Sequence, residues 1–344
     1  MNILSKIFIL ISFLAMASCS GTISIMGAGA TFPEPLYSKM FSEYRKNNSV
    51  EINYQPIGSG GGIRQLINKT VNFGATDVPM TEDELKDAKA KIVHIPVCIG
   101  AVAVVYNLSN VDKLKLSSDV LADIFLGKIT NWKDKRLTDL NPDITLPDLP
   151  IVVVKRSDGS GTTYTFSEYL CAVSTEWEKT VGKGKSLNWP TGIGAKGNTG
   201  VAAYVKQTPG AIGYVEKSYA SENNLKIAYL KNKANNFVLP EIENIKEAAR
   251  TTEKDILNTG IINSKNKNAY PISTFSWIIV YKDLSLSTKN IKQAQAIVEL
   301  LWWMTHNGQK FNEIYDFAPL PENIMPLVEE RILSLVYKDK SLKQ

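Results

Sequence analysis

The sequence predicts an α/β protein of two lobes, in which each lobe is a mixed, mostly parallel sheet flanked by helices and a ligand cleft lies between the lobes. Two observations predict this class. Strand-like and helix-like stretches alternate along the chain, as they do in parallel-rich sheets covered by helices. The chain of 344 residues is also long enough for two domains. No segment repeats at a fixed short period, so a solenoid is not expected.

The first part of the chain alternates regularly between strands and helices. Strands are expected at residues 22–26, 50–54 and 73–76. The helix after the first strand has an apolar face, formed by Leu36, Tyr37, Met40, Phe41 and Tyr44. The short helix after the second strand carries Ile63, Leu66 and Ile67. Thr81 and Glu84 have the spacing of a capping box, which predicts that a further helix begins there.

The pattern is interrupted once and then restarts. Residues 92–106 contain two strand-like stretches that are broken at Gly100, and we interpret this break as a crossing between lobes. In the next part, strands are expected at 151–154, 211–215 and 226–230, and helices at 120–125, after Gly161 and around 201–205. After a polar stretch from 232 to 268, the chain closes with a strand at 275–281 and helices at 287–306 and 322–336.

Both ends of the chain are expected to form one lobe, with the second lobe inserted between them. This arrangement would explain two crossings, near residues 100 and 265. We therefore expect lobe I to consist of residues 19–100 and 265–344 and lobe II of residues 101–264.

The N-terminus has the features of an export signal. Lys6 precedes an apolar run from Ile7 to Ala17, which is too short to span a bilayer and has the length of the apolar region of a secretory signal. Small residues stand directly before Cys19, as in bacterial lipoproteins, where this cysteine is acylated after residues 1–18 are removed. Ordinary cleavage after Ala17 is the alternative. We expect an exported protein with a lipid anchor at Cys19.

The charge and cysteine content exclude some partners. The formal net charge is +5, with lysines and acidic residues interspersed along the chain, so no nucleic acid partner is expected. Cys98 and Cys171 lie far apart in different predicted elements. An oxidising compartment would permit a disulfide between them, but we expect none.

Three loops rich in glycine and hydroxyl groups lie where a strand leads into a helix. They span Gly27–Pro33, Gly58–Gly62 and Lys155–Thr163. Helix N-termini with free N–H groups bind anions. In the third loop the Arg156 guanidinium can bind an oxyanion through two hydrogen bonds, and Asp158 is close enough to orient it. The loops together predict a tetrahedral oxyanion enclosed from both lobes.

Asp77 places a carboxylate at the end of the strand at 73–76. Because like charges repel, a carboxylate would ordinarily disfavour binding of an anion beside it. An ionised carboxylate only accepts hydrogen bonds. Asp77 would therefore favour a phosphate that still carries a proton over sulfate, which has none to donate.

Competing motifs are weaker. A dinucleotide site at the first loop would need a third glycine where Phe32 stands, and Glu51 lies at the start of the second strand rather than near its end. Gly192–Gly197 also fits G-x-G-x-x-G, but Trp189 and Pro190 precede it rather than a strand. We interpret that run as a structural entrance to the helix after it.

The sequence offers little for catalysis. It has no Walker A, H-E-x-x-H or G-x-S-x-G motif. Its two histidines, His94 and His306, lie in an apolar stretch and near a helix end, and we interpret both as structural. No enzyme activity, metal or cofactor is expected.

The loops and their spacing resemble the periplasmic phosphate-binding proteins, the PstS-like solute-binding proteins of ATP-driven (ABC) phosphate uptake. The matching stretches run in the same order and are Gly27–Tyr37, Asn53–Gly62, Asn72–Met80, Phe125–Trp132, Arg156–Leu170, Gly194–Gly200 and Pro209–Glu216. The resemblance implies phosphate contacts from Ala30, Thr31, Phe32, Ser59, Asp77, Arg156, Ser160, Gly161 and Thr162. It also implies that Asp158 holds Arg156. Gly60 is a departure, because relatives often have a second serine there.

The resemblance also implies a function. A monomer with two lobes that close around a hinge would bind inorganic phosphate outside the cytoplasmic membrane, in the periplasm or on the extracytoplasmic face, and deliver it to the membrane subunits of an ABC permease. Two alternatives stay open. One is an exported phosphatase or phosphoester-binding enzyme, and the other is a lipoprotein that senses phosphate or acts as an adhesin without transport.

Overall fold

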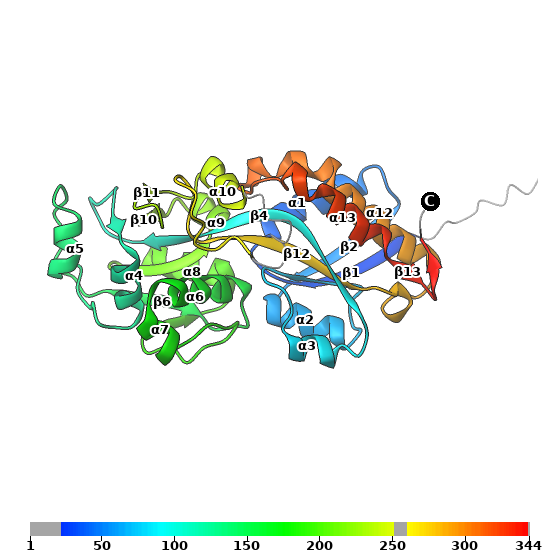
Figure 1. Ribbon diagram of the computed structural model, residues 1–344, viewed down its shortest axis with the longest axis horizontal. Coiled ribbons are helices and arrows are strands. Elements are labelled where there is room, and N and C mark those ends of the chain that lie inside the picture. The colour runs from blue at the N-terminus through cyan, green and yellow to red at the C-terminus, as the bar shows by residue number, and fades with distance from the viewer. Residues whose placement is uncertain (1–21, 251–259, 343–344) are drawn as a thin grey trace, which may run out of the picture.

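The computed structural model describes residues 22–250 and 260–342, which form two lobes side by side along the long axis of the molecule (Figure 1). The predicted leader and Cys19 lie outside the described residues. In Figure 1 both ends of the described chain lie in the right-hand lobe, lobe I, and the middle of the chain forms the left-hand lobe, lobe II. The alternating pattern therefore produces the expected α/β class with two lobes.

Lobe I is built on a sheet in which parallel strands adjoin an antiparallel pair. The strand order is β2-β1-β3-β12-β4. Its strands are β1 (Ile23–Gly29), β2 (Val50–Pro56), β3 (Phe73–Thr76), β12 (Ser273–Tyr281) and the first part of β4 (Ile92–Tyr106). The helices of this lobe are α1 (Glu34–Arg45), α2 (Ser59–Ile67), α3 (Glu82–Asp87), α12 (Ile291–Thr305) and α13 (Met325–Leu333). The predicted apolar face of α1 is buried, as is the short strand β3.

Lobe II continues the same sheet from the second part of β4. There the order is β4-β8-β6-β7, formed by β8 (Ala211–Glu216), β6 (Val152–Arg156) and β7 (Ile193–Ala195), with β9 (Lys226–Ile227) also on β4. Its helices are α4 (Ser118–Phe125), α5 (Lys135–Leu140), α6 (Gly161–Val173), α7 (Thr175–Thr180), α8 (Gly197–Gln207), α9 (Lys217–Glu222) and α10 (Ile242–Ala249). A small sheet joins β5 (Lys115–Leu116), β10 (Tyr229–Lys231) and β11 (Phe237–Val238), and a hairpin joins β13 (Val336–Tyr337) and β14 (Lys340–Ser341).

β4 is one continuous strand, so the interpretation of two stretches broken at Gly100 is wrong. Residues 92–101 pair with β12 and residues 102–106 pair with β8, so one strand serves both lobes. Gly100 has a packing role, because a Cβ there would lie only 2.4 Å from the Phe32 ring. The change of partner after Ala101 supports our proposal that the chain passes from lobe I to lobe II at residue 100.

Other differences from the sequence predictions lie at element ends. The helix predicted from residue 287 begins at Ile291, because the Asn290 side chain accepts a hydrogen bond from the Gln293 N–H and caps it. The strand predicted at 226–230 divides into β9 and β10. The helix predicted at 322–336 is a 3₁₀ turn followed by α13, which ends at Leu333. The capping box at Thr81 and Glu84 is confirmed.

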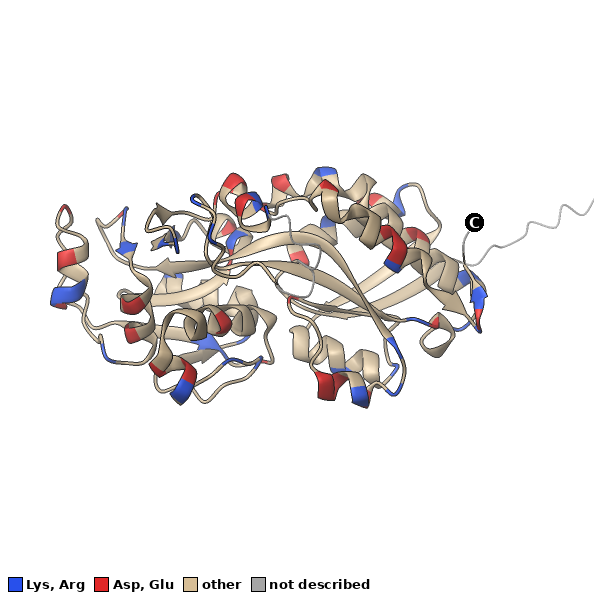
Figure 2. Cartoon of the chain, in the orientation of Figure 1, with Lys and Arg blue, Asp and Glu red and all other residues tan. Residues whose placement is uncertain are grey.

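Charged residues lie mostly on the outer helices and loops of both lobes, whereas few lie on the strands that join the lobes (Figure 2). Among the described residues, no helix is long and apolar enough to cross a membrane. Cys98 is buried and Cys171 is half-buried, and both are free thiols.

Candidate functional site

Four helix N-termini meet between the lobes, two from each side. The starts of α1 and α2 come from lobe I, and the starts of α6 and α8 come from lobe II. The Ser59 hydroxyl on α2 accepts a hydrogen bond from the Gly161 N–H on α6 at 3.2 Å. Thr31, just before α1, accepts one from the Asn198 N–H on α8 at 3.3 Å. Because the first N–H groups of a helix lack partners within that helix, this region concentrates hydrogen-bond donors and positive dipole ends.

Glycines allow the two lobes to approach this closely. A Cβ on Gly161 would lie 2.4 Å from an Asp77 carboxylate oxygen and 2.5 Å from the Ser59 hydroxyl. Gly58, with φ of 86°, turns the chain into α2 in a conformation that favours glycine. The Gly60 N–H donates to the Gly159 carbonyl of lobe II at 2.9 Å. The Gly60 backbone therefore joins the lobes.

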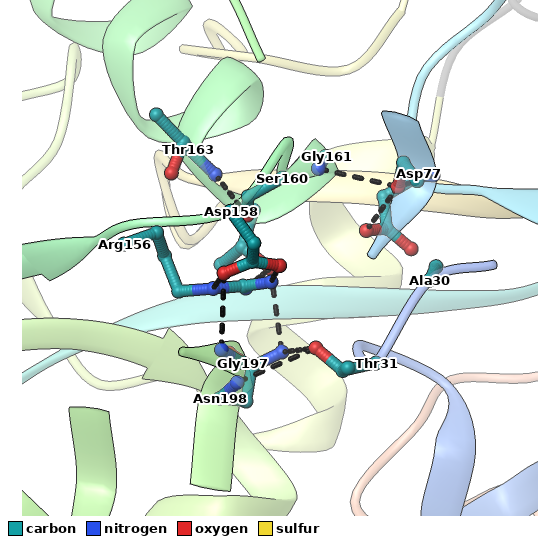
Figure 3. A network of polar contacts seen from close by, with 12 residues as sticks. Ala30, Thr31, Asp77, Arg156, Asp158, Ser160, Gly161, Thr163, Gly197 and Asn198 are labelled. Atoms are coloured by element: carbon teal, nitrogen blue, oxygen red, sulfur yellow. Dashed lines mark hydrogen bonds and ion pairs between the residues drawn. The ribbon is translucent and has the colours of Figure 1, made fainter. Parts of the chain in front are cut away.

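Arg156 brings one buried cation into the site. Its side chain is 1% exposed. Nε and Nη2 donate to the two Asp158 carboxylate oxygens at 2.8 and 2.5 Å, and Nη1 donates to the Thr162 hydroxyl at 3.2 Å. A guanidinium has five N–H groups, so each Nη nitrogen keeps one for a ligand. The predicted role of Asp158 in orienting Arg156 matches this geometry, shown in Figure 3.

Asp158 links Arg156 to α8. One of its carboxylate oxygens also accepts from the Gly197 N–H, the first of that helix, at 3.0 Å. Burial raises the pKa of Asp158, but the hydrogen bond and positive charge of Arg156 outweigh burial, so the net pKa lies below its ordinary value. Asp158 is therefore ionised at neutral pH and holds both the cation and the helix end.

Asp77 supplies a buried carboxyl group on the opposite wall. It is 1% exposed. The Ser276 and Ser59 hydroxyls donate to its two oxygens, each at 3.2 Å. Burial raises the pKa of Asp77 to about 7, against the opposing effects of Arg156 and the two serines. Asp77 can therefore accept or hold a proton near neutral pH.

Asn198 is a residue of the site that the sequence did not reveal. It is fully buried, its side-chain amide donates to the Thr31 hydroxyl at 2.9 Å, and its carbonyl oxygen accepts from the Glu216 N–H at 3.0 Å. No strand precedes Gly192–Gly197, but β7 lies within that run and pairs with β6. A three-residue strand carries no periodicity. The position of Asn198 at the start of a glycine-led helix was the available signal.

The structure brings most of the predicted residues together. Some of them already use their polar groups in hydrogen bonds within the protein. Hydrogen bonds join Ser59, Asp77 and Gly161 in one group. A second group contains Thr31, Arg156, Asp158 and Thr162, linked in part through Asn198. The two groups meet at the adjacent residues Gly161 and Thr162. The Ser160 hydroxyl caps α6 by accepting from the Thr163 N–H at 3.0 Å, which leaves its hydrogen to donate. Phe32 is buried with its ring edge-on to Phe317. The Ala30 N–H donates to the Ala75 carbonyl at 2.9 Å, so that N–H is already used within lobe I.

Among the described residues, three ion pairs join the lobes outside these hydrogen-bonded groups, of which the pair of Lys246 and Glu313, at 2.7 Å, is the most exposed. Lys185 of lobe II contacts Glu84 of lobe I at 2.6 Å, and Lys217 of lobe II contacts Asp316 of lobe I at 2.9 Å. Both lysines are largely buried. The described structure is therefore the closed arrangement of the lobes.

The site has no histidine beside its hydroxyl groups. His94 accepts a hydrogen bond from the Met80 N–H at 3.0 Å, and His306 stacks on Trp302 with ring centroids 4.2 Å apart. No group of three or more metal-ligating side chains occurs within residues 22–250 and 260–342. The arrangement combines one cation, helix N-termini, hydroxyls and a carboxyl group, which suits binding of a small oxyanion that carries a proton.

The chain is similar to known solute-binding proteins. Residues 17–298 match the family model described as a PBP superfamily domain. The phosphate-binding protein PstS of Pasteurella multocida is 43% identical over 326 residues, which cover 93% of this chain and 92% of that protein. The PstS of Methanocaldococcus jannaschii is 40% identical, over 88% of this chain and 84% of that protein.

Solved structures share the fold at lower identity. The periplasmic phosphate-binding protein PfluDING, solved with bound phosphate, is 21% identical with a TM-score of 0.71 and covers 90% of this chain and 93% of that one. A phosphate-binding protein of Stenotrophomonas maltophilia is 18% identical with a TM-score of 0.66, over 89% and 93% of the two chains. These structures support the two-lobed fold.

Proposed function

The chain belongs to the PstS family of phosphate-binding proteins within the PBP superfamily, and we propose from its site that it binds inorganic phosphate between the lobes and delivers it to an ABC-type phosphate permease. The observation that carries this proposal is the opposition of Arg156 and Asp77 across a buried cluster of helix N-termini. The cation and the dipole ends favour an anion, and the carboxyl group favours one that can donate a proton.

Both lobes supply contacts to phosphate in the proposed complex. In the proposed complex, Thr31, Phe32, Ser59 and Asp77 contact phosphate from lobe I, and Arg156 with Ser160, Gly161 and Thr162 contacts it from lobe II. Asn198 and Asp158 hold these groups in place through their hydrogen bonds to Thr31 and Arg156. Because its N–H already serves Ala75, Ala30 would contribute through packing.

The enclosure of the site argues for the free ion over an ester. Ser59, Asp77, Ser160 and Thr162 are each at most 1% exposed. A phosphoester carries an organic substituent that would need a path out between lobes already joined by direct hydrogen bonds. The family is one of solute-binding proteins, and a site enclosed in this way favours capture of a small ion over hydrolysis of an ester.

Titration with three ligands tests the proposal. We expect phosphate to saturate the protein with affinity near micromolar or somewhat tighter, since five heavy atoms at about −1.5 kcal/mol each give roughly −7.5 kcal/mol. Sulfate and a phosphoester should give no saturable signal in the same range. Calorimetry measures all three directly. Tighter binding of the phosphoester or sulfate than of phosphate would contradict the assignment.

We further propose that residues 1–18 are an export signal and that Cys19, also outside the described residues, carries a lipid that anchors a monomer to the extracytoplasmic side of a membrane. The sequence pattern before Cys19 supports this placement. In cells, the protein should partition into the detergent-rich phase of Triton X-114, and Cys19→Ala should move it to the aqueous phase. Equal partitioning of the two forms would exclude the anchor.

A further inference from the structure

A cavity lies in lobe I, away from the site between the lobes. Its volume is about 440 Å³, within the range of ~300–1,000 Å³ typical of ligand pockets. The lining comes from the start of β4, from β12 and its end, and from α13, which crosses beside β4 in Figure 1. The polar residues that matter below are Lys91, His94, Trp277, Lys282, Glu330 and Arg331.

The cavity is positively charged. Lys91, Lys282 and Arg331 oppose the single carboxylate of Glu330. Tyr281 and Ile92 are the last paired residues of β12 and β4. The next residues, Lys282 and Lys91, also face each other, because the backbone N–H of Lys282 donates to the Lys91 carbonyl at 2.8 Å. The two lysines are thus cross-strand neighbours, and like charges in such positions repel.

No direct ion pair among the described residues relieves this repulsion. Within the described part of the chain, neither lysine forms an ion pair with an acidic side chain. Lys282 is half-buried at the cavity wall. An anion seated between Lys91 and Lys282 would replace the repulsion with two attractive interactions.

Trp277 adds an unused donor to the cavity wall. Its side chain is 2% exposed, yet its indole N–H has no hydrogen-bond partner among the described residues. The ring is held in place by the Arg331 guanidinium at 6.0 Å and by the edge-on His94 ring at 6.3 Å. Arg331 is itself fixed by its donation to the His94 carbonyl at 2.8 Å. The indole N–H is not among the fully buried polar atoms that lack a partner, so it faces the open cavity, where a ligand acceptor can reach it.

His94 contributes a neutral donor. Its Nε2 accepts from the Met80 N–H at 3.0 Å, so in the neutral ring the proton is on Nδ1. Burial lowers the pKa of His94 to about 4, which keeps the ring neutral at physiological pH. The cavity therefore presents mainly donors and positive charge, with apolar surface from Leu327 and Val93.

We propose that this cavity is a second binding site, for a small organic anion that carries a carboxylate or phosphate group. The anionic group lies between Lys91 and Lys282, and the carbon part of the ligand packs against the apolar wall and extends along β12 toward Trp277. This inference is independent of phosphate binding between the lobes.

Nuclear magnetic resonance of the tryptophan indole N–H groups tests the site directly. The signal of Trp277 is the one that disappears in Trp277→Phe. We titrate citrate, as a carboxylate probe, and glycerol 3-phosphate, as a phosphate probe, with and without saturating inorganic phosphate. At least one probe should shift this signal to a plateau, equally in both conditions. A signal that does not respond to either probe would overturn the proposal.

Variants distinguish a specific binding site from non-specific electrostatic attraction of the probe to basic surface residues. Lys91→Gln and Lys282→Gln should each weaken binding of the active probe about tenfold, whereas Lys179→Gln, on the exposed surface of α7, should leave it unchanged. Equal weakening by all three would show non-specific attraction and refute a built site. Because each cavity variant also removes the repulsion, its melting temperature should be no lower than that of wild type, which confirms that it folds.

Discussion

Replacing Arg156 by alanine is expected to weaken phosphate binding by at least about a hundredfold. Arg156 is the cation of the network between the lobes, and its side chain is almost completely buried. Its loss would leave the phosphate charge beside Asp77 without a counter-charge and would leave buried Asp158 unpaired. Removing one partner of a buried ion pair typically costs about 3–5 kcal/mol, and 3 kcal/mol corresponds to roughly 150-fold in affinity.

Lys155→Ala is the matched control for this experiment. Lys155 is the adjacent cation in β6, but its ammonium group lies over the Trp189 ring at 6.0 Å instead of joining the network. We expect it to bind phosphate like wild type. Calorimetry of both variants, with melting temperatures to establish folding, provides the comparison. Retention of wild-type affinity by a folded Arg156→Ala protein would remove Arg156 from the site.

Replacing Asp77 by asparagine is expected to reduce the preference for phosphate over sulfate by about a hundredfold or more. Ionised Asp77 can accept a hydrogen bond from a protonated phosphate but only repels sulfate, whereas an asparagine amide can donate a hydrogen bond to either anion. A site that leaves such a hydrogen bond unmade can reject the wrong ligand by as much as about 10⁴–10⁵. Competition titrations with the two anions measure the ratio, and Asp83→Asn, whose carboxylate is 91% exposed, serves as control. An unchanged ratio in Asp77→Asn would exclude this role.

The same variant should change how the empty protein responds to pH. In the closed arrangement burial raises the pKa of Asp77 to about 7 from its ordinary 3.8. Below about pH 4 the Asp77 carboxyl group is protonated in both the open and the closed form, so it does not affect the free energy of closing. Between about 4 and 7 closing requires uptake of a proton, so closing becomes less favourable as pH rises, by about 4 kcal/mol in full. Small-angle scattering without phosphate should therefore show wild type opening over this range, and the difference from Asp77→Asn should vanish at the acidic end.

The three loops were predictable because their chemistry is local. Glycines and hydroxyls between a strand and a helix indicate an exposed helix N-terminus wherever they occur, and Gly58–Gly62 and Lys155–Thr163 have that pattern within a few residues. Asp158 likewise lies two residues from the arginine that it holds. Relations over so few residues can be inferred from the sequence without knowledge of the tertiary structure.

Contacts between distant parts of the chain could not be predicted in this way. Asn198 meets Thr31 across 167 positions of sequence, and Ser276 reaches Asp77 across 199. Nothing near either residue identifies its partner. Gly100 suggested the end of a strand because glycine is uncommon within strands. The structure shows another reason for a glycine there, because the Phe32 ring leaves no room for a side chain at position 100. These features depend on which surfaces the fold brings together.

The convergence of two helix N-termini from each lobe also bears on how long the ligand stays bound. Neither lobe alone surrounds the ion, and hydrogen bonds such as those from Gly161 to Ser59 and from Asn198 to Thr31 must break before it can leave. The lifetime of the complex is therefore set by the rate at which the lobes separate along β4 and β12, and loss of a single ligand contact affects it less. A partner that pulls the lobes apart could release the cargo quickly without competing for any of its binding groups.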